Sequence, residues 1–498
     1  MHDLPILTML LLLLLAGAGA VMLCPRPRGD LVRGTALTTS LLAFLCSLPL
    51  FWLYDGTRAE PFRFVEHVPW IERFGIAYSL GLDGVSLLLV LLTTLLGPVG
   101  VLASWNAIDR RTKEFYASFL LLEASVLGVF MARDLVLFYV FWEVMLVPMF
   151  LIIAVWGGEK RVYAGVKFFI YTMAGSLLML VALVYVYLRT GAQTFQIAEL
   201  QALLAALPPE RALSHTEEVL LFLGFAIAFA IKVPVFPFHT WLPDAHTEAP
   251  TAGSVMLAAV LLKMGAYGLL RIAIPFFPGG AEALAPLAMV LAVVGIIYGA
   301  LMALAQEDWK RLIAYSSVSH LGFVVLGIFA RTETALSGAV FQMLAHGLAT
   351  GLLFLLVGSI YERTHSRRID DYGGIARVVP GFAAVFMITV LASAGLPGLN
   401  GFVGEFLVLA GTFLRHPLAA ACGALGVILA AAYLLTLYQR TMFGPLVHER
   451  HRALADLAPR EWSYYVPLLG LTAIMGIWPQ PFLDVMGASL HAIPQLVK

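Results

Sequence analysis

Two lysines lie deep inside apolar runs of the sequence, where a charged group is costly. Lys232 falls in FAIAFAIKVPVFPFHTW and Lys263 in SVMLAAVLLKMGAYGLL. Two glutamates are placed in the same way, Glu143 in LVLFYVFWEVMLVP and Glu405 in GLPGLNGFVGEFLVLAG. A charged side chain at the centre of a bilayer costs roughly 2.5–3.5 kcal/mol on insertion scales, so such residues usually mark an ion or proton pathway. Two buried bases and two buried acids therefore predict a proton relay.

Three of the twelve histidines also fall within apolar runs, namely His239, His320 and His346. Imidazole titrates near neutral pH, so these side chains can bridge a relay. A lone buried histidine, however, is more often a satisfied structural group. The sequence has no HxxxH or HExxH pair, no CxxC spacing and no glycine-rich phosphate or dinucleotide motif. We therefore expect neither a metal site nor a bound cofactor in this chain.

Further ionisable residues lie closer to the ends of apolar runs. Glu123 fits an accessory role in the relay and a structural hydrogen bond equally well. Lys167 lies about one turn into its helix, and we expect its long side chain to snorkel to the interface, with an accessory transport role as the alternative. Asp134 stands at a helix start and is interpreted as an N-cap, and Asp83 is interpreted as structural.

These groups must be positioned by helices that cross a membrane. The 498-residue chain is 60% hydrophobic and 12% charged, with a mean hydropathy of +0.89, which excludes an ordinary soluble enzyme. Its apolar runs are continuous, as spanning helices require, and do not alternate as in a β-barrel. We predict an all-α integral membrane protein of about fourteen helices, at residues 5–24, 33–54, 79–104, 114–132, 134–156, 163–189, 217–242, 252–275, 283–305, 308–330, 335–361, 380–414, 418–443 and 463–490.

Two of these helices contain residues that interrupt a regular helix. Lys232 is followed by Pro234 and Pro237, and Glu405 is preceded by Gly395, Pro397 and Gly398. Proline removes a backbone donor and clashes with the preceding turn, and irregular backbone at membrane depth is tolerated only around a protein-lined or wet cavity. We predict that helices 7 and 12 are discontinuous and that each break lies beside a relay group.

The spacing of the buried groups suggests an internal repeat. Lys232 and Glu405 are 173 residues apart, and Glu143 and His320 are 177 apart. This offset predicts two inverted five-helix repeats, as in many transporters, although the halves share little sequence. We divide the single membrane domain into helices 1–3 (1–110), a first repeat (111–275), a second repeat (280–445) and a C-terminal loop and helix (446–498).

The basic residues predict the orientation of the chain. Odd-numbered loops carry 18 lysines and arginines and even-numbered loops carry 9, the latter including Arg271. By the positive-inside rule, odd-numbered loops face the cytoplasm and both termini lie on the other side.

Several long motifs resemble a known family. The segments FWEVMLVPMFLI, KFFIYTMAGSLLML, AFAIKVPVFPFHTWLPDAHTEAPTAGSVMLAAVLLKMGAYGLLR, DWKRLIAYSSVSHLGFVVLGI, FQMLAHGLATGLLF and GLPGLNGFVGEF resemble the antiporter-like membrane subunits of respiratory complex I, the NADH:quinone oxidoreductase, over about residues 75–445. Within that family, Glu405 and the loop YERTHSRRIDDYGGI point to one member, because the sister chains L and N carry lysine where this chain has Glu405.

The resemblance implies a fourteen-helix pump with pseudo-symmetric halves, one of a row joined by a polar axis. It implies a Glu143–Lys232 pair, a central Lys263, a terminal acid at Glu405, and His239, His320 and His346 as bridges. It further implies that charge coupled to quinone reduction drives protons from the cytoplasm to the far side. NADH, flavin, iron–sulfur clusters and quinone are expected in other subunits. The expected partners are chains L and N and the lipid of an energy-coupling membrane, such as a bacterial inner membrane, with no nucleic acid.

Two alternative functions remain open at this point. Multisubunit sodium/proton antiporters and membrane-bound hydrogenases share these motifs. A structural scaffold that only bridges other membrane chains is the non-enzymatic alternative, and it predicts that replacing Lys232 or Glu143 leaves pumping intact. A scaffold has no reason to bear the cost of four midplane charges, which favours the pump.

Overall fold

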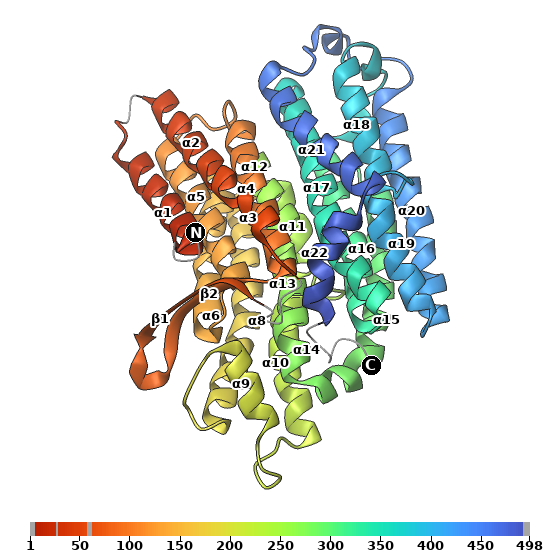
Figure 1. The fold of residues 1–498 in the computed structure, drawn as a ribbon. Helices are drawn as coiled ribbons and strands as arrows, with labels where there is room; N and C mark the ends of the chain where they lie inside the picture. The colour runs from red at the N-terminus through yellow and green to blue at the C-terminus, as the bar shows by residue number, and fades with distance from the viewer. Residues whose placement is uncertain (1–4, 26–27, 57–61, 492–498) are drawn as a thin grey trace.

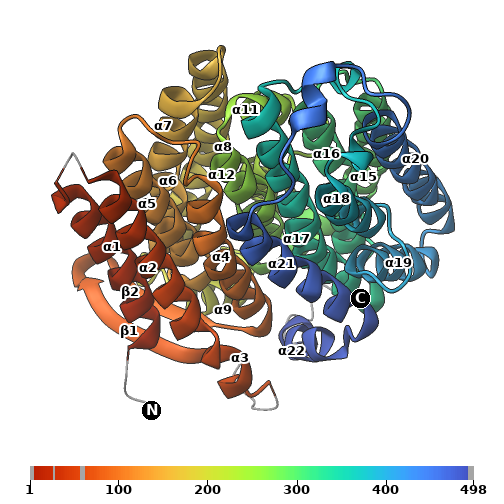
Figure 2. The ribbon, with the colours of Figure 1, turned by 90° about the horizontal axis from the view of Figure 1, so that it is seen from above.

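The structure is a computed structural model that describes residues 5–25, 28–56 and 62–491. These ranges leave out both chain ends and three of the basic residues counted above, Arg26, Arg58 and Lys498. The helices run side by side, from α1 at one edge of the molecule to α20 at the other (Figure 1). Seen from above, α17 lies near the middle of the bundle (Figure 2). The chain is therefore an α-helical membrane protein, as the composition predicts.

The N-terminal part combines helices with a hairpin that the sequence analysis missed. Its elements are α1 (Ile6–Leu23), α2 (Gly29–Ser47), α3 (Pro49–Leu53), β1 (Arg63–Ile71), the 3₁₀ turn η1 (Glu72–Phe74), β2 (Ile76–Leu82) and α4 (Gly84–Ala103). Strands β1 and β2 pair antiparallel. Helix α4 begins only after Asp83, which forms a capping box with Ser86. The predicted helix start at residue 79 is wrong, because residues 76–82 are extended and pair with β1.

The hairpin also holds the first helix in place. The Glu66 carboxylate of β1 accepts hydrogen bonds from the backbone N–H groups of Leu7, at 2.7 Å, and Thr8, at 3.0 Å. These donors lie in the first turn of α1, where no intrahelical acceptor exists. A side chain distant in sequence therefore supplies the cap that Pro5, the residue before α1, does not provide.

The middle of the chain contains several short helices, two π-helical segments and several longer helices. The elements are α5 (Thr112–Met131), α6 (Leu135–Val144), α7 (Leu146–Trp156), α8 (Arg161–Arg189), α9 (Ile197–Ala205), α10 (His215–Lys232), α11 (Trp241–Glu248), α12 (Thr251–Met256), η2 (Leu257–Leu261), α13 (Leu262–Gly268), η3 (Leu269–Ala273) and α14 (Ile274–Phe276). Asp134 caps α6 by accepting from the N–H groups of Val136 and Leu137, which confirms its predicted role.

The C-terminal part is also helical, with short 3₁₀ turns in its loops. The elements are α15 (Pro278–Leu304), α16 (Trp309–Phe329), α17 (Glu333–Thr364), η4 (Ile369–Asp371), η5 (Ile375–Arg377), α18 (Pro380–Ser393), α19 (Asn400–Phe413), α20 (Pro417–Met442), η6 (Glu449–Ala453), α21 (Pro459–Ile477) and α22 (Gln480–His491). The last predicted helix, 463–490, is bent by 72° between α21 and α22.

Eleven helical segments in the described ranges are long and apolar enough to cross a membrane, or twelve if the bent pair α21–α22 counts as one span. Their burial differs sharply. The most apolar window is 100% buried in α16 and α17 and 94% buried in the span Thr251–Phe276, but only 33% buried in α15 and α20. The three most buried spans are therefore those that carry His320, His346 and Lys263.

An ion pair fastens the Lys263 span to α4. The Arg271 guanidinium contacts the carboxylate of Asp83, which is fully buried. Arg271, which the charge count assigned to a loop, lies inside the span Thr251–Phe276. Asp83 therefore has the predicted structural role, since it both caps α4 and pairs with a base two turns beyond Lys263.

A buried histidine lies in the loop before α21. His451 stacks on Tyr372, with ring centroids 5.6 Å apart, and lies beside His448. Burial lowers the pKa of His451, the neighbouring His448 and Arg450 lower it further, and Asp371 opposes them. This loop therefore favours the uncharged imidazole.

Candidate functional site

Lys263 lies at the centre of the protein, on a short α-helical segment between two π-helical ones. Its side chain is fully buried. The Nζ atom donates to the carbonyl oxygen of Ala258, at 2.6 Å, and lies 2.6 Å from Nδ1 of His346. An ammonium has donors only, so the imidazole accepts at Nδ1 when Lys263 is charged. Single-turn π-helical bulges are frequent at functional sites, and here one of them contains the acceptor Ala258.

A second buried cluster surrounds Glu405, where five helices meet. Its Oε1 atom lies 2.7 Å from Nδ1 of His320 and accepts from Nε2 of Gln342 at 3.0 Å. On the other side of the ring, His320 Nε2 lies 3.0 Å from the Tyr433 hydroxyl and 3.3 Å from Ser393 Oγ. The carboxylate and imidazole are thus hydrogen-bonded to each other and fixed by neutral polar groups, as buried ionisable groups require.

The two clusters meet at a pair of histidines. The rings of His320 and His346 are 6.0 Å apart between centroids. On α17, Gln342 and His346 are four residues apart and so lie on one face of the helix. The Nε2 atom of His346 is buried and has no hydrogen-bond partner among the described residues. Lys263, His346, His320 and Glu405 therefore form one row across the core, which we call the central row.

Lys232 lies outside this row, against the segment that carries Glu143. Its Nζ atom lies 5.2 Å from the Trp142 ring, 5.4 Å from the Phe168 ring and 3.9 Å from Met145 Sδ. Aromatic faces attract a cation, more strongly when it is desolvated. Among the described residues, no ion pair within 4.0 Å joins Lys232 to Glu143. The structure therefore brings Lys232 to the neighbours of Glu143 but not to its carboxylate.

Glu143 and His239 are each close to the relay without joining the row. Glu143 is half-buried on α6, and its Oε1 has no hydrogen-bond partner in the described part of the chain. His239 is buried between α10 and α11, within 5.6 Å of Phe236 and 5.2 Å of Tyr298 between ring centroids. No contact of His239 with His320 or His346 is found among the described residues.

The two accessory candidates have different surroundings. Lys167 forms an ion pair with Asp244, with 2.7 Å between Nζ and Oδ2, and does not snorkel freely. Glu123 is fully buried, and neither carboxylate oxygen has a partner within the described ranges. A Cβ added at Gly97 would lie 2.4 Å from Glu123 Oε1, so the carboxylate packs directly against the backbone of α4.

The predicted helix-breaking residues lie between separate helices. Pro234 and Pro237 fall between α10, which ends at Lys232, and α11. Trp241 Nε1 donates to the carbonyl of Ile231, at 2.9 Å, and so satisfies a group near the end of α10.

Gly395, Pro397 and Gly398 fall between α18 and α19. Gly395 has φ +79° and Gly398 φ +93°, a conformation that L side chains rarely adopt. Glu405 follows in the second turn of α19.

Two buried residues near the site were missed by the sequence analysis. His246, on α11, stacks on Phe354 with centroids 4.6 Å apart, and neither ring nitrogen has a partner in the described chain. The side chain of Lys310, at the start of α16, is buried and donates to the carbonyl of Ala249. His246 stands in a polar, proline-flanked stretch and Lys310 beside Arg311, so both resembled loop residues.

These two residues approach a polar cavity. The cavity has a volume of about 190 Å³, and its lining includes Lys310, Glu248, Glu362 and Arg367. The charges of Lys310 and Lys263 both act on His246. His246 therefore lies within electrostatic range of one lysine that lines the cavity and one that belongs to the central row.

Comparison with known proteins identifies the family. Residues 132–431 match a family model described as NADH:quinone oxidoreductase/Mrp antiporter, TM. The chain is 47% identical to NADH-quinone oxidoreductase subunit M of Rhodobacter capsulatus, over 98% of this chain and 96% of that protein. Subunit M of Pseudomonas aeruginosa is 45% identical over 98% and 97%. The chain belongs to the subunit M family. This confirms the family, and the particular member, that Glu405 and the loop after residue 360 predicted.

A solved structure supports the same assignment. A chain of respiratory complex I from Thermus thermophilus with bound NADH is 35% identical, matches 99% of this chain and 100% of its own length, and superposes with a TM-score of 0.89. This chain thus shares its whole fold with a complex I membrane chain, the hairpin and the bent C-terminal helix included in the matched length.

Proposed function

We propose that this chain is the proton-translocating membrane subunit M of NADH-quinone oxidoreductase and that the central row carries the proton. The observation that carries the proposal is the row itself: Lys263 lies 2.6 Å from His346, and His320 lies 2.7 Å from Glu405, in the most buried part of the protein. Buried ionisable groups in contact across a membrane protein form proton relays in pumps and transporters.

The transfer steps follow from the hydrogen-bonding capacity of each group. Lys263 gives its proton to His346 at Nδ1, and the imidazole releases a proton from its other nitrogen, Nε2. The ring centroids of the two histidines are 6.0 Å apart, too far for a direct hydrogen bond, so proton transfer between them requires a bridging water. His320 then passes the proton to Glu405 across a 2.7 Å contact.

Uptake occurs on the side of the polar cavity. Lys310 lines this cavity, and His246 lies within the electrostatic range of both Lys310 and Lys263. We place the cavity on the cytoplasmic side, where the positive-inside rule puts the loops that carry Lys310 and Arg367. Glu405, at the opposite end of the row, releases the proton to the other side.

The driving charge enters through Glu143 and Lys232. Glu143 is half-buried and has an unpartnered oxygen, which suits a residue that faces a neighbouring subunit. We propose chains L and N as the neighbours. A change of charge near Glu143 acts on Lys232, and then on Lys263, through Coulomb coupling.

The proposed topology has fourteen spans. Helices α10 and α11 together make the seventh, and α18 and α19 make the twelfth. Each of α18 and α19 has 14 residues, which is about 21 Å of rise and too short for a hydrocarbon core of about 30 Å. Spans four to eight (111–275) and nine to thirteen (280–445) form two inverted repeats. Segments 1–110 and 446–498 flank them, and both termini lie on the non-cytoplasmic side.

The redox chemistry is assigned to other subunits. In the described ranges no three His, Cys, Asp or Glu side chains are placed to hold a metal ion. Following the resemblance, we assign NADH, flavin, iron–sulfur clusters and quinone to other subunits of the complex. The family description also includes the Mrp antiporter, so a sodium/proton antiporter subunit is the second candidate.

The test is proton pumping per electron in inverted membrane vesicles that contain the assembled complex. Lys263→Ala is expected to abolish pumping through this subunit and lower the ratio of protons to electrons. Lys160→Ala, which removes an exposed lysine, is the matched control. An unchanged ratio in fully assembled Lys263→Ala would overturn the relay. Intact pumping in Lys232→Ala and Glu143→Ala would favour the structural scaffold. Pumping that depends on sodium would favour the sodium/proton antiporter subunit.

A further inference from the structure

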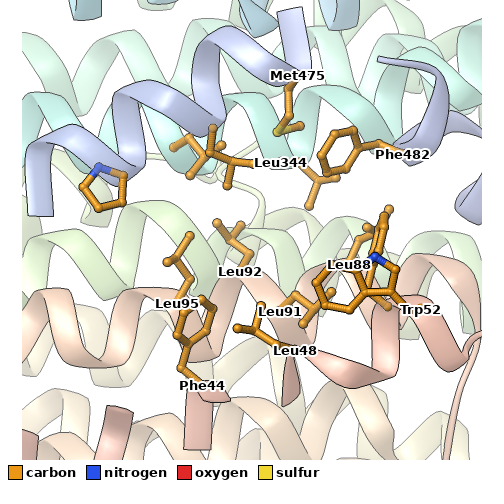
Figure 3. Close-up of a pocket in the computed structure, with 14 residues that line it drawn as sticks. Phe44, Leu48, Trp52, Leu88, Leu91, Leu92, Leu95, Leu344, Met475 and Phe482 are labelled. Atoms are coloured by element: carbon orange, nitrogen blue, oxygen red, sulfur yellow. The ribbon is translucent and has the colours of Figure 1, made fainter. Parts of the chain in front are cut away.

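An elongated apolar cavity lies apart from the relay, between the N-terminal helices and the bent C-terminal pair (Figure 3). Its volume is about 350 Å³, and all of its fourteen lining residues are apolar or aromatic. Apart from Leu344 and Leu348 of α17, the lining residues fall outside residues 132–431, the part that matches the antiporter family. The cavity is therefore not part of the proton path.

The lining residues run along the helices. On α4, the lining residues run from Leu88 to Leu95 along one face of the helix. On α21, they run from Pro467 to Met475. Seven or eight residues of helix correspond to about 10–12 Å of rise. The cavity is thus a tube roughly parallel to the helices, with α2 and α3 forming the wall opposite α21, as Figure 3 shows for Leu48 and Met475.

The dimensions decide what can occupy the tube. A spanning helix about 30 Å long and 10–12 Å across occupies on the order of 2,400–3,400 Å³, several times the cavity volume of about 350 Å³. A transmembrane helix of a neighbouring subunit therefore does not fit inside the cavity. Water is disfavoured because an apolar cavity lacks the polar partners that a buried water needs.

We propose that this tube binds one acyl chain of a membrane phospholipid. Chains of this kind surround the protein, lie parallel to its helices and are slim enough to enter. Transfer from bulk lipid brings no hydrophobic gain; the favourable term is packing, because an unfilled tube deprives its lining of van der Waals contacts.

The aromatic end of the tube fits the level of the lipid head group. Trp52, at the end of α3, is 75% exposed beside Phe482 at this end (Figure 3). Tryptophan is enriched at the membrane–water interface. The backbone carbonyl of Asp55, three residues after Trp52 in sequence, accepts a hydrogen bond from the guanidinium of Arg63 at 2.9 Å. A cation near the aromatic end complements a phosphate group.

The site also supports the relay helix. Leu344 and Leu348 contribute to the tube wall, and His346 lies between them in sequence on α17, with its ring turned to Lys263 and His320. An acyl chain in the tube therefore packs against the helix that carries His346. Removal of the lipid would loosen α17 on the face away from the proton path.

The test is photolabelling of the assembled complex in vesicles of phosphatidylethanolamine and phosphatidylglycerol. A fraction of the lipid carries a diazirine in its acyl chain, and the labelled peptides are mapped by mass spectrometry. We expect label in residues 44–52, 88–95 and 467–482. Leu91→Trp and, separately, Leu95→Trp fill the tube and should reduce this label at least fivefold. Leu301→Trp, at a half-exposed site on α15, is the matched control and should leave it unchanged.

Three outcomes would overturn the proposal. Wild-type complex with label around Leu301 but none in the tube peptides would show that a neighbouring subunit covers the opening. Label that persists in both Leu91→Trp and Leu95→Trp would place the lipid outside the tube. Label that is displaced by excess long-tailed quinone but not by excess phospholipid would assign the tube to quinone. If one filling variant fails to assemble, the other and the wild-type map still decide.

Discussion

Replacing His346 should separate proton transfer from the rest of the reaction. In the described part of the chain, Lys263 Nζ has two hydrogen-bond partners, the Ala258 carbonyl and His346 Nδ1, each at 2.6 Å. His346→Phe keeps a ring of similar size but removes one acceptor. A hydrogen bond to a charged group contributes about 1.5–3 kcal/mol, which corresponds to about 10- to 150-fold in a rate constant if it is lost on the transfer step. We therefore expect proton pumping through this subunit to fall about 10- to 150-fold.

A second substitution distinguishes the acceptor from the carrier. His346→Gln provides a side-chain acceptor for Lys263 but cannot take a proton on one nitrogen and release it from another. It should assemble better than His346→Phe and pump no better. The control is His451→Phe, which also replaces a buried histidine stacked on an aromatic ring, but in a loop outside the row.

The assay records pumping and electron transfer in the same sample. NADH oxidation and acidification of inverted vesicles are followed together, and assembly is checked on a native gel. The reasoning is refuted if assembled His346→Gln pumps with the wild-type ratio of protons to electrons, because a path that bypasses this imidazole must then exist.

Three further predictions concern packing, a buried charge and pH. Gly404→Ala should destabilise the protein by about 1–3 kcal/mol and reduce pumping, since its Cβ would lie 2.4 Å from a side chain of α17; Gly470→Ala, in open space, should change neither the melting temperature nor pumping. Arg271→Leu should cost about 3–5 kcal/mol by leaving Asp83 buried without its partner, and the additional change Asp83→Asn should restore most of the melting temperature of the complex. The folded-state pKa of His451 is lowered, so its contribution to stability is present above the unfolded-state pKa of about 6.5 and is lost as pH falls below that value. Proteolysis of the 443–458 loop should therefore accelerate from pH 8 to 5.5, and His451→Phe should remove that acceleration.

The central row could be predicted from the sequence because charge and imidazole are conspicuous in an apolar chain. Lys263, His320, His346 and Glu405 all stand in runs that would otherwise favour lipid. Hydropathy alone, however, cannot tell which apolar runs are buried inside the protein, since α15 and α16 are both apolar and, of the two, only α16 is entirely buried. The arrangement of the helices makes that distinction, and it also brings Gln342, Ser393 and Tyr433 around the acid and imidazole, where no motif marked them.

Other features escaped prediction for physical reasons. The β1–β2 hairpin ends in the apolar stretch 80–82, which continues into α4, so the strand resembled the start of a helix until Asp83 fixed the cap. His246 was missed because α11 is short and polar, and its burial comes from Phe354 and the surrounding spans. Long-range packing decides such cases, and a sequence window contains none of it.

The surroundings of Lys232 bear on the proposed electrostatic coupling between Glu143 and Lys232. A direct ion pair with Glu143 would hold both charges tightly, because buried pairs in good geometry are hard to separate. Here Lys232 instead contacts the faces of Trp142 and Phe168, a weaker attraction than an ion pair. Glu143 is half-buried and carries an oxygen without a partner in the described chain. A charge arriving from outside the chain can therefore act on Glu143 without first breaking an ion pair with Lys232. In the proposed mechanism, this missing ion pair lets a small external change of charge act on Lys232 and, through it, on Lys263.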